Sequence, residues 1–258
     1  MINQNFIVSG MMGDFLHCMY VVKHICTRDN TMANIYLVDG HHGDVWNFGK
    51  DTAHNDLLKL MGQQSYVAGF YNIADIPDNY INLNAWRLSV ATTFHETGEY
   101  NKCWSDVLSE FFKFAPAFPK WINVDEGDVN TTNKILIHRS IHRHGGLPWQ
   151  KIVDQFDELL FVTSNPSEFD HFPVKSSKVK LYQVANIYDM ASAMKDCKYF
   201  IGNQSALFAL ASALDIPRLV ELEQGVWKFY GDETKYSTNM SWYLNDITKN
   251  IQTDIIKL

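Results

Sequence analysis

The feature that most constrains the fold is a regular alternation of short apolar runs and helical patterns between residues 134 and 222. Short apolar runs are typical of buried strands, and the segments between them place apolar side chains at helical spacing. The predicted strands are 134–138, 159–164, 178–182, 199–201 and 218–222. The predicted helices are 147–156, 186–197 and 205–214. Strands that alternate with helices form βαβ units, so we expect this region to fold around a parallel sheet.

The N-terminal part of the chain begins in the same way and then becomes weaker in signal. A predicted strand over 6–9 leads through a glycine turn into a predicted helix over 14–26, and a second strand is predicted over 35–38. Further short strands are predicted over 66–71 and 80–83, and a further helix over 105–114. This beginning indicates that another α/β unit precedes the one predicted over residues 134–222.

A proline-containing segment, 115–119, and a polar stretch, 125–133, are the best candidates for a linker between the two units. We therefore predict an α/β protein with two small, doubly wound, Rossmann-like domains that face each other across a cleft. The predicted domains are residues 1–125 and 126–258, and we expect the tail after residue 225 to pack back on the first domain. Ligands of such folds bind at the carboxyl ends of the strands.

The composition excludes several classes of protein. The chain has 258 residues, of which 46% are hydrophobic and 14% aromatic, so it can bury a core. Its formal net charge of -7 argues against a broad nucleic-acid surface. The apolar stretch 206–214 is far shorter than the roughly 20 residues that span a bilayer, and the N-terminus does not resemble a signal peptide. The scattered cysteines predict a reducing, cytoplasmic location with mostly buried thiols.

The first candidate site is the turn that precedes the first helix. Gly10 and Gly13 allow a tight turn, and Asp14 falls at the start of the helix. A carboxylate at this place can simply cap the helix and interact with its dipole. Alternatively it is a rigidly held proton acceptor at the mouth of the cleft, with His17 as a second candidate catalytic residue of the same motif. Both interpretations stay open on the residues alone.

The second candidate site is a basic cluster over residues 138–144, directly after a predicted strand. It holds the arginines Arg139 and Arg143 in an otherwise acidic chain. Because arginine forks bind phosphate oxygens, this cluster predicts an anion site. A metal site built from its three histidines is less favoured, since no carboxylate or cysteine lies at ligand spacing. A solvated basic loop is the third interpretation.

The third candidate site is the loop from Gly202 to Ser205, between a predicted strand and a helix of small residues. The glycine allows a close approach, and Ser205 with the free N–H groups of the helix could hold an oxyanion or a phosphate. Tight packing of the helix explains the alanines that follow, but it does not explain the Gly-Asn-Gln-Ser loop.

Taken in order, these pieces resemble the GT-B glycosyltransferases, and most closely the heptosyltransferase-like family, glycosyltransferase family 9. That family opens with a strand and a Gly-Asp motif, which Gly13-Asp14 matches. Its C-terminal domain opens with a strand, a small or basic loop and a Trp-containing helix, as in residues 138–149. Residues 187–217 look like its C-terminal motif, with Gln204-Ser205 in place of Asp-Ser. The histidine of the family's last helix is replaced by Phe208 or Ala209.

The resemblance implies an inverting, metal-independent glycosyltransferase without a cofactor. It would move a sugar from a nucleotide-sugar donor to a hydroxyl of a glycan or other acceptor, with Asp14 as general base. The residues that it implies for the donor diphosphate are Arg139, Arg143, Gly202, Asn203, Gln204 and Ser205. Those that it implies for the base and ribose are His138, Tyr182, Gln183 and Val184.

Two other functions stay open. One is a sugar-nucleotide epimerase or hydrolase on the same fold, which would need no acceptor. The other is a binding module that has lost the chemistry, which would turn over no donor. The sequence does not assign an oligomeric state.

Overall fold

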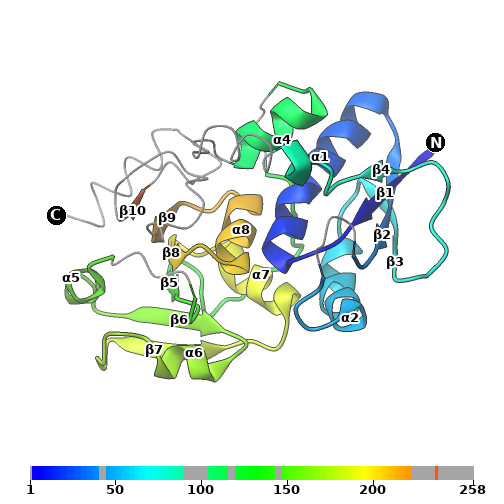
Figure 1. The fold of residues 1–258 in the computed structure, drawn as a ribbon. Coiled ribbons are helices and arrows are strands. Elements are labelled where there is room, and N and C mark those ends of the chain that lie inside the picture. The colour runs from blue at the N-terminus through cyan, green and yellow to red at the C-terminus, as the bar shows by residue number, and fades with distance from the viewer. Residues whose placement is uncertain are drawn as a thin grey trace.

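The computed structural model describes residues 2–40, 45–89, 104–115, 120–142, 147–221 and 236–237. Two parallel sheets follow one another along the chain (Figure 1). The first sheet has the strand order β3-β2-β1-β4. Its strands are β1 (Asn3–Val8), β2 (Met32–Leu37), β3 (Val67–Tyr71) and β4 (Ile81–Asn82). The helices of this half are α1 (Met12–Asp29), α2 (Lys50–Met61) and α4 (Trp104–Phe112).

The second sheet has the strand order β10-β9-β8-β5-β6-β7, in which β10 (Tyr236–Ser237) is the antiparallel edge strand. Its parallel strands are β5 (Ile135–His138), β6 (Leu159–Thr163), β7 (Val179–Gln183), β8 (Tyr199–Asn203) and β9 (Arg218–Glu221). Its helices are α5 (Trp149–Asp154), α6 (Pro166–Asp170), α7 (Ile187–Lys195) and α8 (Ala206–Ala213). The predicted parallel sheet of this region is confirmed, and so is the α/β fold with two Rossmann-like units.

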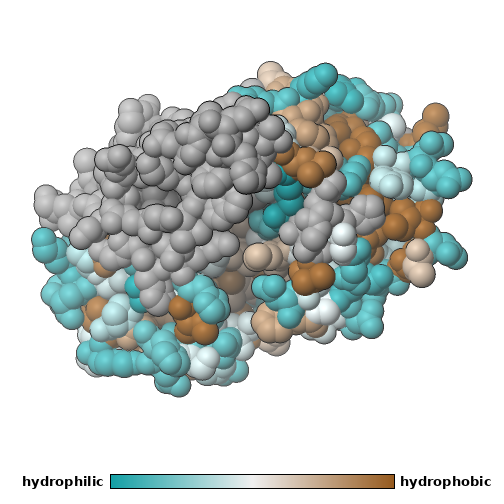
Figure 2. All heavy atoms as spheres, viewed as in Figure 1, coloured by the Kyte–Doolittle hydropathy of each residue, from teal (hydrophilic) through white to brown (hydrophobic). Residues whose placement is uncertain are grey.

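The position of each strand in the second sheet explains its composition. The interior strands β5 and β6 are buried at every residue, and their sequences are almost entirely apolar. Strand β7 forms one edge and exposes Lys180 and Gln183. The surface over β7 and α6 is mainly hydrophilic (Figure 2), which suits an edge strand that must not pair with another chain.

One hydrophobic cluster runs through both halves of the chain. It includes buried residues of α1 and α2 from the first half and of α7 and α8 from the second half. Helix α1 packs against α8, and α2 packs against α7 (Figure 1). A second, smaller cluster fills the other face of the second sheet around Phe161 and Trp149. The two sheets are therefore joined by a layer of helices that lies between them.

One helix was not predicted, and two predictions about the domain boundary and the tail stay untested. Helix α2 lies in a region where no helix was expected. The boundary near residue 125 falls between α4 and β5 and stays a prediction. In the tail, Tyr236 and Ser237 form β10, which pairs antiparallel with β9 of the second sheet. The rest of the tail after residue 225 lies outside the described residues, so its packing on the first domain stays a prediction.

Cys18, Cys26 and Cys197 are buried as expected, and Cys103 lies outside the described residues. Within the described ranges, no helix combines the length and the hydrophobicity needed to cross a membrane.

Candidate functional site

The two glycines near the start of α1 have different roles. Gly10 has a φ of 104°, which a residue with a side chain rarely adopts, so it makes the turn. Gly13 lies inside the first turn of α1 rather than in the glycine turn where it was expected. A Cβ atom on Gly13 would lie 3.4 Å from the Cα atom of Ala206 and 3.9 Å from Cβ of Ala209. Gly13 therefore lets the beginning of α1 lie directly against the beginning of α8.

This contact places two helix N-termini side by side. Helix α1 follows the carboxyl end of β1, and α8 follows the carboxyl end of β8. Ser205 is the N-cap residue of α8, but its side chain makes no capping hydrogen bond. Its Oγ atom is buried and has no hydrogen-bond partner among the described residues. Because helix N-termini carry partial positive charge and free N–H groups, the arrangement favours an anion near this point.

Asp14 lies in the first turn of α1 and forms an ion pair with Arg87, which follows β4. The side chain of Asp14 is 18% exposed and that of Arg87 is 24% exposed. The side chain of Asp14 is thus partly accessible to solvent, in the first turn of α1. No local sequence signal indicates Arg87, because 73 positions separate it from Asp14.

His17, the second candidate catalytic residue, lies one turn further along α1 and is only 6% exposed. Burial lowers the pKa of His17 well below its usual value, and the positive charge of Arg218 acts in the same direction. The ring is therefore neutral near pH 7. Its catalytic role stays a prediction.

Arg139, expected to bind the donor diphosphate, lies at the carboxyl end of β5 and pairs with Glu221 at the end of β9. Its Nε donates to Oε2 at 2.8 Å and its Nη2 donates to Oε1 at 3.2 Å. Glu221 has no exposed surface and also accepts hydrogen bonds from the Leu147 amide and the Trp149 indole. The second expected arginine, Arg143, lies outside the described residues.

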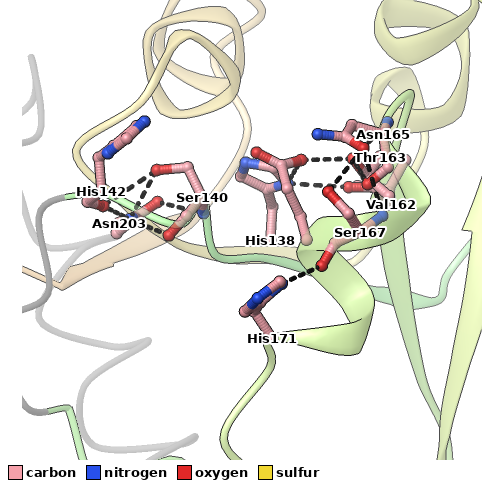
Figure 3. A network of polar contacts seen from close by, with 10 residues as sticks. His138, Ser140, His142, Val162, Thr163, Asn165, Ser167, His171 and Asn203 are labelled. Carbon is pink, nitrogen blue, oxygen red and sulfur yellow. Dashed lines mark hydrogen bonds and ion pairs between the residues drawn. The ribbon is translucent and has the colours of Figure 1, made fainter.

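Asn203 and Gly202 shape the loop after β5 (Figure 3). The fully buried Asn203 accepts a hydrogen bond from the Ser140 amide at 3.1 Å and donates to the His142 carbonyl at 2.6 Å. A Cβ atom on Gly202 would lie 3.0 Å from the His138 carbonyl oxygen, so the glycine permits close pairing of β5 and β8. Gln204 is 9% exposed. Asn203 and Gly202 thus have structural roles that the sequence pattern did not indicate.

His138 is buried between β5 and β6 (Figure 3). Its Nδ1 lies 3.0 Å from the Val162 carbonyl oxygen and 4.0 Å from Oε2 of Glu168. Because a carbonyl oxygen only accepts, Nδ1 carries the hydrogen and Nε2 is the acceptor of the neutral ring. Burial lowers the pKa of His138, which the charge of Glu168 and the Val162 hydrogen bond partly oppose.

The remaining residues expected near the base and ribose lie at the end of the edge strand β7. The Tyr182 hydroxyl donates a hydrogen bond to Asp128, and burial followed by this carboxylate raises the pKa of Tyr182. Gln183 is exposed, and Val184 is buried. These three residues do not adjoin His138 in the sheet, because β6 lies between β5 and β7.

Among the residues that the structure describes, no group of three or more histidine, cysteine, aspartate or glutamate side chains has the arrangement of a metal site. This finding leaves the expected independence from metals untested.

Two Rossmann-like units joined through helices are the arrangement of the GT-B fold, which is the class of fold that the sequence motifs indicate. No protein-family model and no curated protein sequence matches the chain significantly. Solved structures do. The iron-containing dodecameric glycosyltransferase TibC from enterotoxigenic E. coli H10407 is similar at a TM-score of 0.60 and 11% identity, over 96% of this chain and 72% of that one.

Two further structures agree. E. coli heptosyltransferase WaaC is similar at a TM-score of 0.50 and 9% identity, over 85% of this chain and 88% of that one. A family 9 glycosyltransferase from Veillonella parvula is similar at a TM-score of 0.50 and 8% identity, over 99% and 89% of the two chains. At such low identities the similarity shows the fold. The heptosyltransferase-like resemblance is thus confirmed as a GT-B fold.

Proposed function

We propose that this protein is a glycosyltransferase that moves a sugar from a nucleotide-sugar donor to a hydroxyl of a glycan or other acceptor. We further propose that transfer inverts the anomeric carbon, needs no metal and uses Asp14 as general base. A cytoplasmic location is part of the same proposal.

The observation that supports this function is the contact of Gly13 with Ala206. It brings the first turn of α1, which carries Asp14 and follows the first sheet, against the N-terminus of α8, which follows a strand of the second sheet. Sugar transfer needs these two groups close together. A base must meet the acceptor hydroxyl on one side of the anomeric carbon, and positive charge must meet the departing diphosphate on the other.

In the proposed reaction, Asp14 takes the proton of the acceptor hydroxyl while the hydroxyl oxygen of the acceptor attacks the anomeric carbon. The new glycosidic bond forms as the bond to the diphosphate breaks, and the nucleoside diphosphate leaves. Attack from the side opposite the leaving group inverts the configuration. The N–H groups at the start of α8 and the Ser205 hydroxyl would stabilise the negative charge that grows on the diphosphate.

Arg139 would assist at the same place. The pair with Glu221 uses Nε and one N–H of Nη2, and within the described part of the chain both N–H donors of Nη1 stay available for a phosphate oxygen. We propose that the nucleoside lies towards the ends of β6 and β7, near His138 and Tyr182.

A binding screen tests the donor. Among the similar structures, WaaC was solved with ADP-2-deoxy-2-fluoro heptose and TibC with ADP-D-beta-D-heptose, so ADP-linked sugars come first, beside UDP, GDP, CMP and dTDP compounds. A ligand at 100 times its dissociation constant stabilises the folded state by about 2.7 kcal/mol, which a thermal-shift assay detects. One nucleotide should raise the melting temperature equally with and without EDTA. If none does, the proposed donor site is wrong.

Transfer itself is tested by Asp14→Asn in an assay with donor and acceptor. Loss of a positioned base should lower kcat by at least about a hundredfold and leave donor affinity unchanged. Asp51→Asn is the matched control, because Asp51 also lies in the first turn of a helix, α2, but accepts a hydrogen bond from Asn72 instead of pairing with Arg87. Donor turnover without acceptor would instead indicate a hydrolase or epimerase.

A further inference from the structure

The segment that follows β4 holds the beginning of α1 through a buried side chain. Asn84 has no exposed surface and forms two hydrogen bonds with Ser9. Its Oδ1 accepts from the Ser9 amide and its Nδ2 donates to the Ser9 carbonyl, both at 2.8 Å. The Leu83 amide donates to the Ile7 carbonyl at 2.9 Å. These bonds extend the pairing of β1 and β4, so the segment is fixed against the turn that leads to Asp14.

Arg87 lies on this segment, three residues after Asn84, and its amide donates to the Asn84 carbonyl at 3.0 Å. Its Nη2 donates to Oδ2 of Asp14. Its Cζ lies 4.9 Å from the ring centroid of Trp86, which is 2% exposed, so a fixed ring supports the guanidinium. Partial burial of both charged side chains reduces screening by water, and the pair is stronger than one on the open surface.

We infer that Arg87 is a positioning residue for Asp14, which it keeps ionised and in one orientation for proton transfer. This inference rests on the proposed function, because it assigns Asp14 the task of accepting a proton. A guanidinium beside a carboxylate lowers the pKa of that carboxylate, and the N-terminus of α1 acts in the same direction. Both effects favour the carboxylate form, and Oδ2 of Asp14 is held by a residue of the segment that Asn84 fixes.

The first test reads the titration of Asp14 directly and does not depend on activity. The protein is labelled with ¹³C at aspartate carboxyl carbons, and Asp14→Asn assigns the Asp14 resonance. In Arg87→Met the midpoint of the titration should rise by about one pH unit or more. In Arg87→Lys it should rise less, because a positive charge remains. Equal midpoints in the wild-type protein and Arg87→Met would overturn the inference.

Arg28→Met is the matched control. Arg28 forms an ion pair with Asp29 at the opposite end of α1, where the side chain of Arg28 is 53% exposed. Its removal deletes the same kind of charge, from the far end of the helix that carries Asp14, and should leave the Asp14 midpoint unchanged. Thermal unfolding shows whether each variant is folded, and Arg87→Lys keeps the test available if Arg87→Met is not.

The second test measures kcat/KM for transfer against pH. The acid limb of the profile should move to higher pH in Arg87→Met by the same amount as the NMR midpoint. A moved midpoint with an unmoved acid limb, in an enzyme that transfers sugar, would contradict the positioning role. Absence of transfer in the wild-type protein, with a moved midpoint, would contradict the proposed function while supporting the effect of Arg87 on Asp14.

Discussion

Glu221 and Arg139 form a paired contact in which a carboxylate with no exposed surface accepts two hydrogen bonds from one guanidinium. The same carboxylate receives the Leu147 amide and the Trp149 indole. Glu221 therefore ties the end of β9 both to the residue after β5 and to the beginning of α5. The basic cluster at residues 138–144 looks like a free anion site in the sequence, but its Arg139 is paired with the buried Glu221.

Replacing this acid should destabilise the fold. Glu221→Gln keeps the shape of the side chain but leaves the Arg139 charge, 12% exposed, without its counterion. Removing one partner of a buried pair costs about 3–5 kcal/mol. Urea unfolding measures the loss. Glu158→Gln is the control, because Glu158 pairs with Lys134 and Lys180 on the surface and should have little effect. Equal losses in the two variants would show that the buried Glu221–Arg139 pair adds no more to the free energy of unfolding than an ion pair on the surface.

The contact of Gly13 with Ala206 predicts a dependence on side-chain size. In Gly13→Ala the new Cβ reaches Ala206 at ordinary contact distance, and alanine favours the helix, so stability should stay equal or rise by up to about 1 kcal/mol. Gly13→Val adds two further methyl groups with no space and should cost about 1–3 kcal/mol. Thermal unfolding of both variants is the measurement. A valine variant as stable as the alanine variant would mean that the helices are not closely apposed.

Ser205 should matter for ligand affinity and not for stability. Its hydroxyl is buried without a partner in the described part of the chain, so Ser205→Ala should leave the free energy of unfolding unchanged or slightly higher. If the hydroxyl binds the diphosphate, the affinity for the nucleoside diphosphate should fall about tenfold to a hundredfold. Ser212→Ala is the control on the same helix, where the hydroxyl bonds to the Phe208 carbonyl. Calorimetric titration with unchanged affinity in Ser205→Ala would remove Ser205 from the site.

Burial of His138 predicts that acid destabilises the protein. Its folded-state pKa lies below the unfolded value of about 6.5, so the unfolded chain binds a proton that the folded chain does not. The stability is fully present above about pH 6.5 and falls as the pH drops towards the folded-state pKa. His138→Gln, which can still donate to Val162, should flatten this dependence by up to about 1.4 kcal/mol per pH unit.

Urea unfolding between pH 5 and 7.5 checks the change in slope. His171→Gln, at an exposed histidine that follows α6, should leave the slope unchanged. A parallel dependence in His138→Gln and the wild-type protein would show that other groups cause the loss.

Much of the second sheet could be predicted because its interior strands are buried on both faces. Strands such as β6 read as continuous apolar runs, and helix α7 carries a clear start signal in Asn186, whose side chain accepts a hydrogen bond from the Asp189 amide. Helix α2 gives a weaker signal. Its preceding residue, Gly49, provides no side-chain cap, and only four of its residues are buried.

The partners within the site could not be predicted, because strand order creates them. Arg139 meets Glu221 across 82 positions, because β5 and β9 both pair with β8 and their ends lie only one strand apart. Asp14 meets Arg87 only because β4 lies beside β1. A sequence pattern locates the chemical groups at strand ends, but the pairing of those groups depends on which strands become neighbours.

The shared helical layer has a consequence for how the molecule unfolds. The faces of α1 and α8 that meet are apolar, and separation of the two halves would expose both of them to water. Removing either half would expose a hydrophobic surface on the other half. We therefore expect one cooperative transition in calorimetry, in place of the two independent melting steps that a chain of loosely tethered domains would give.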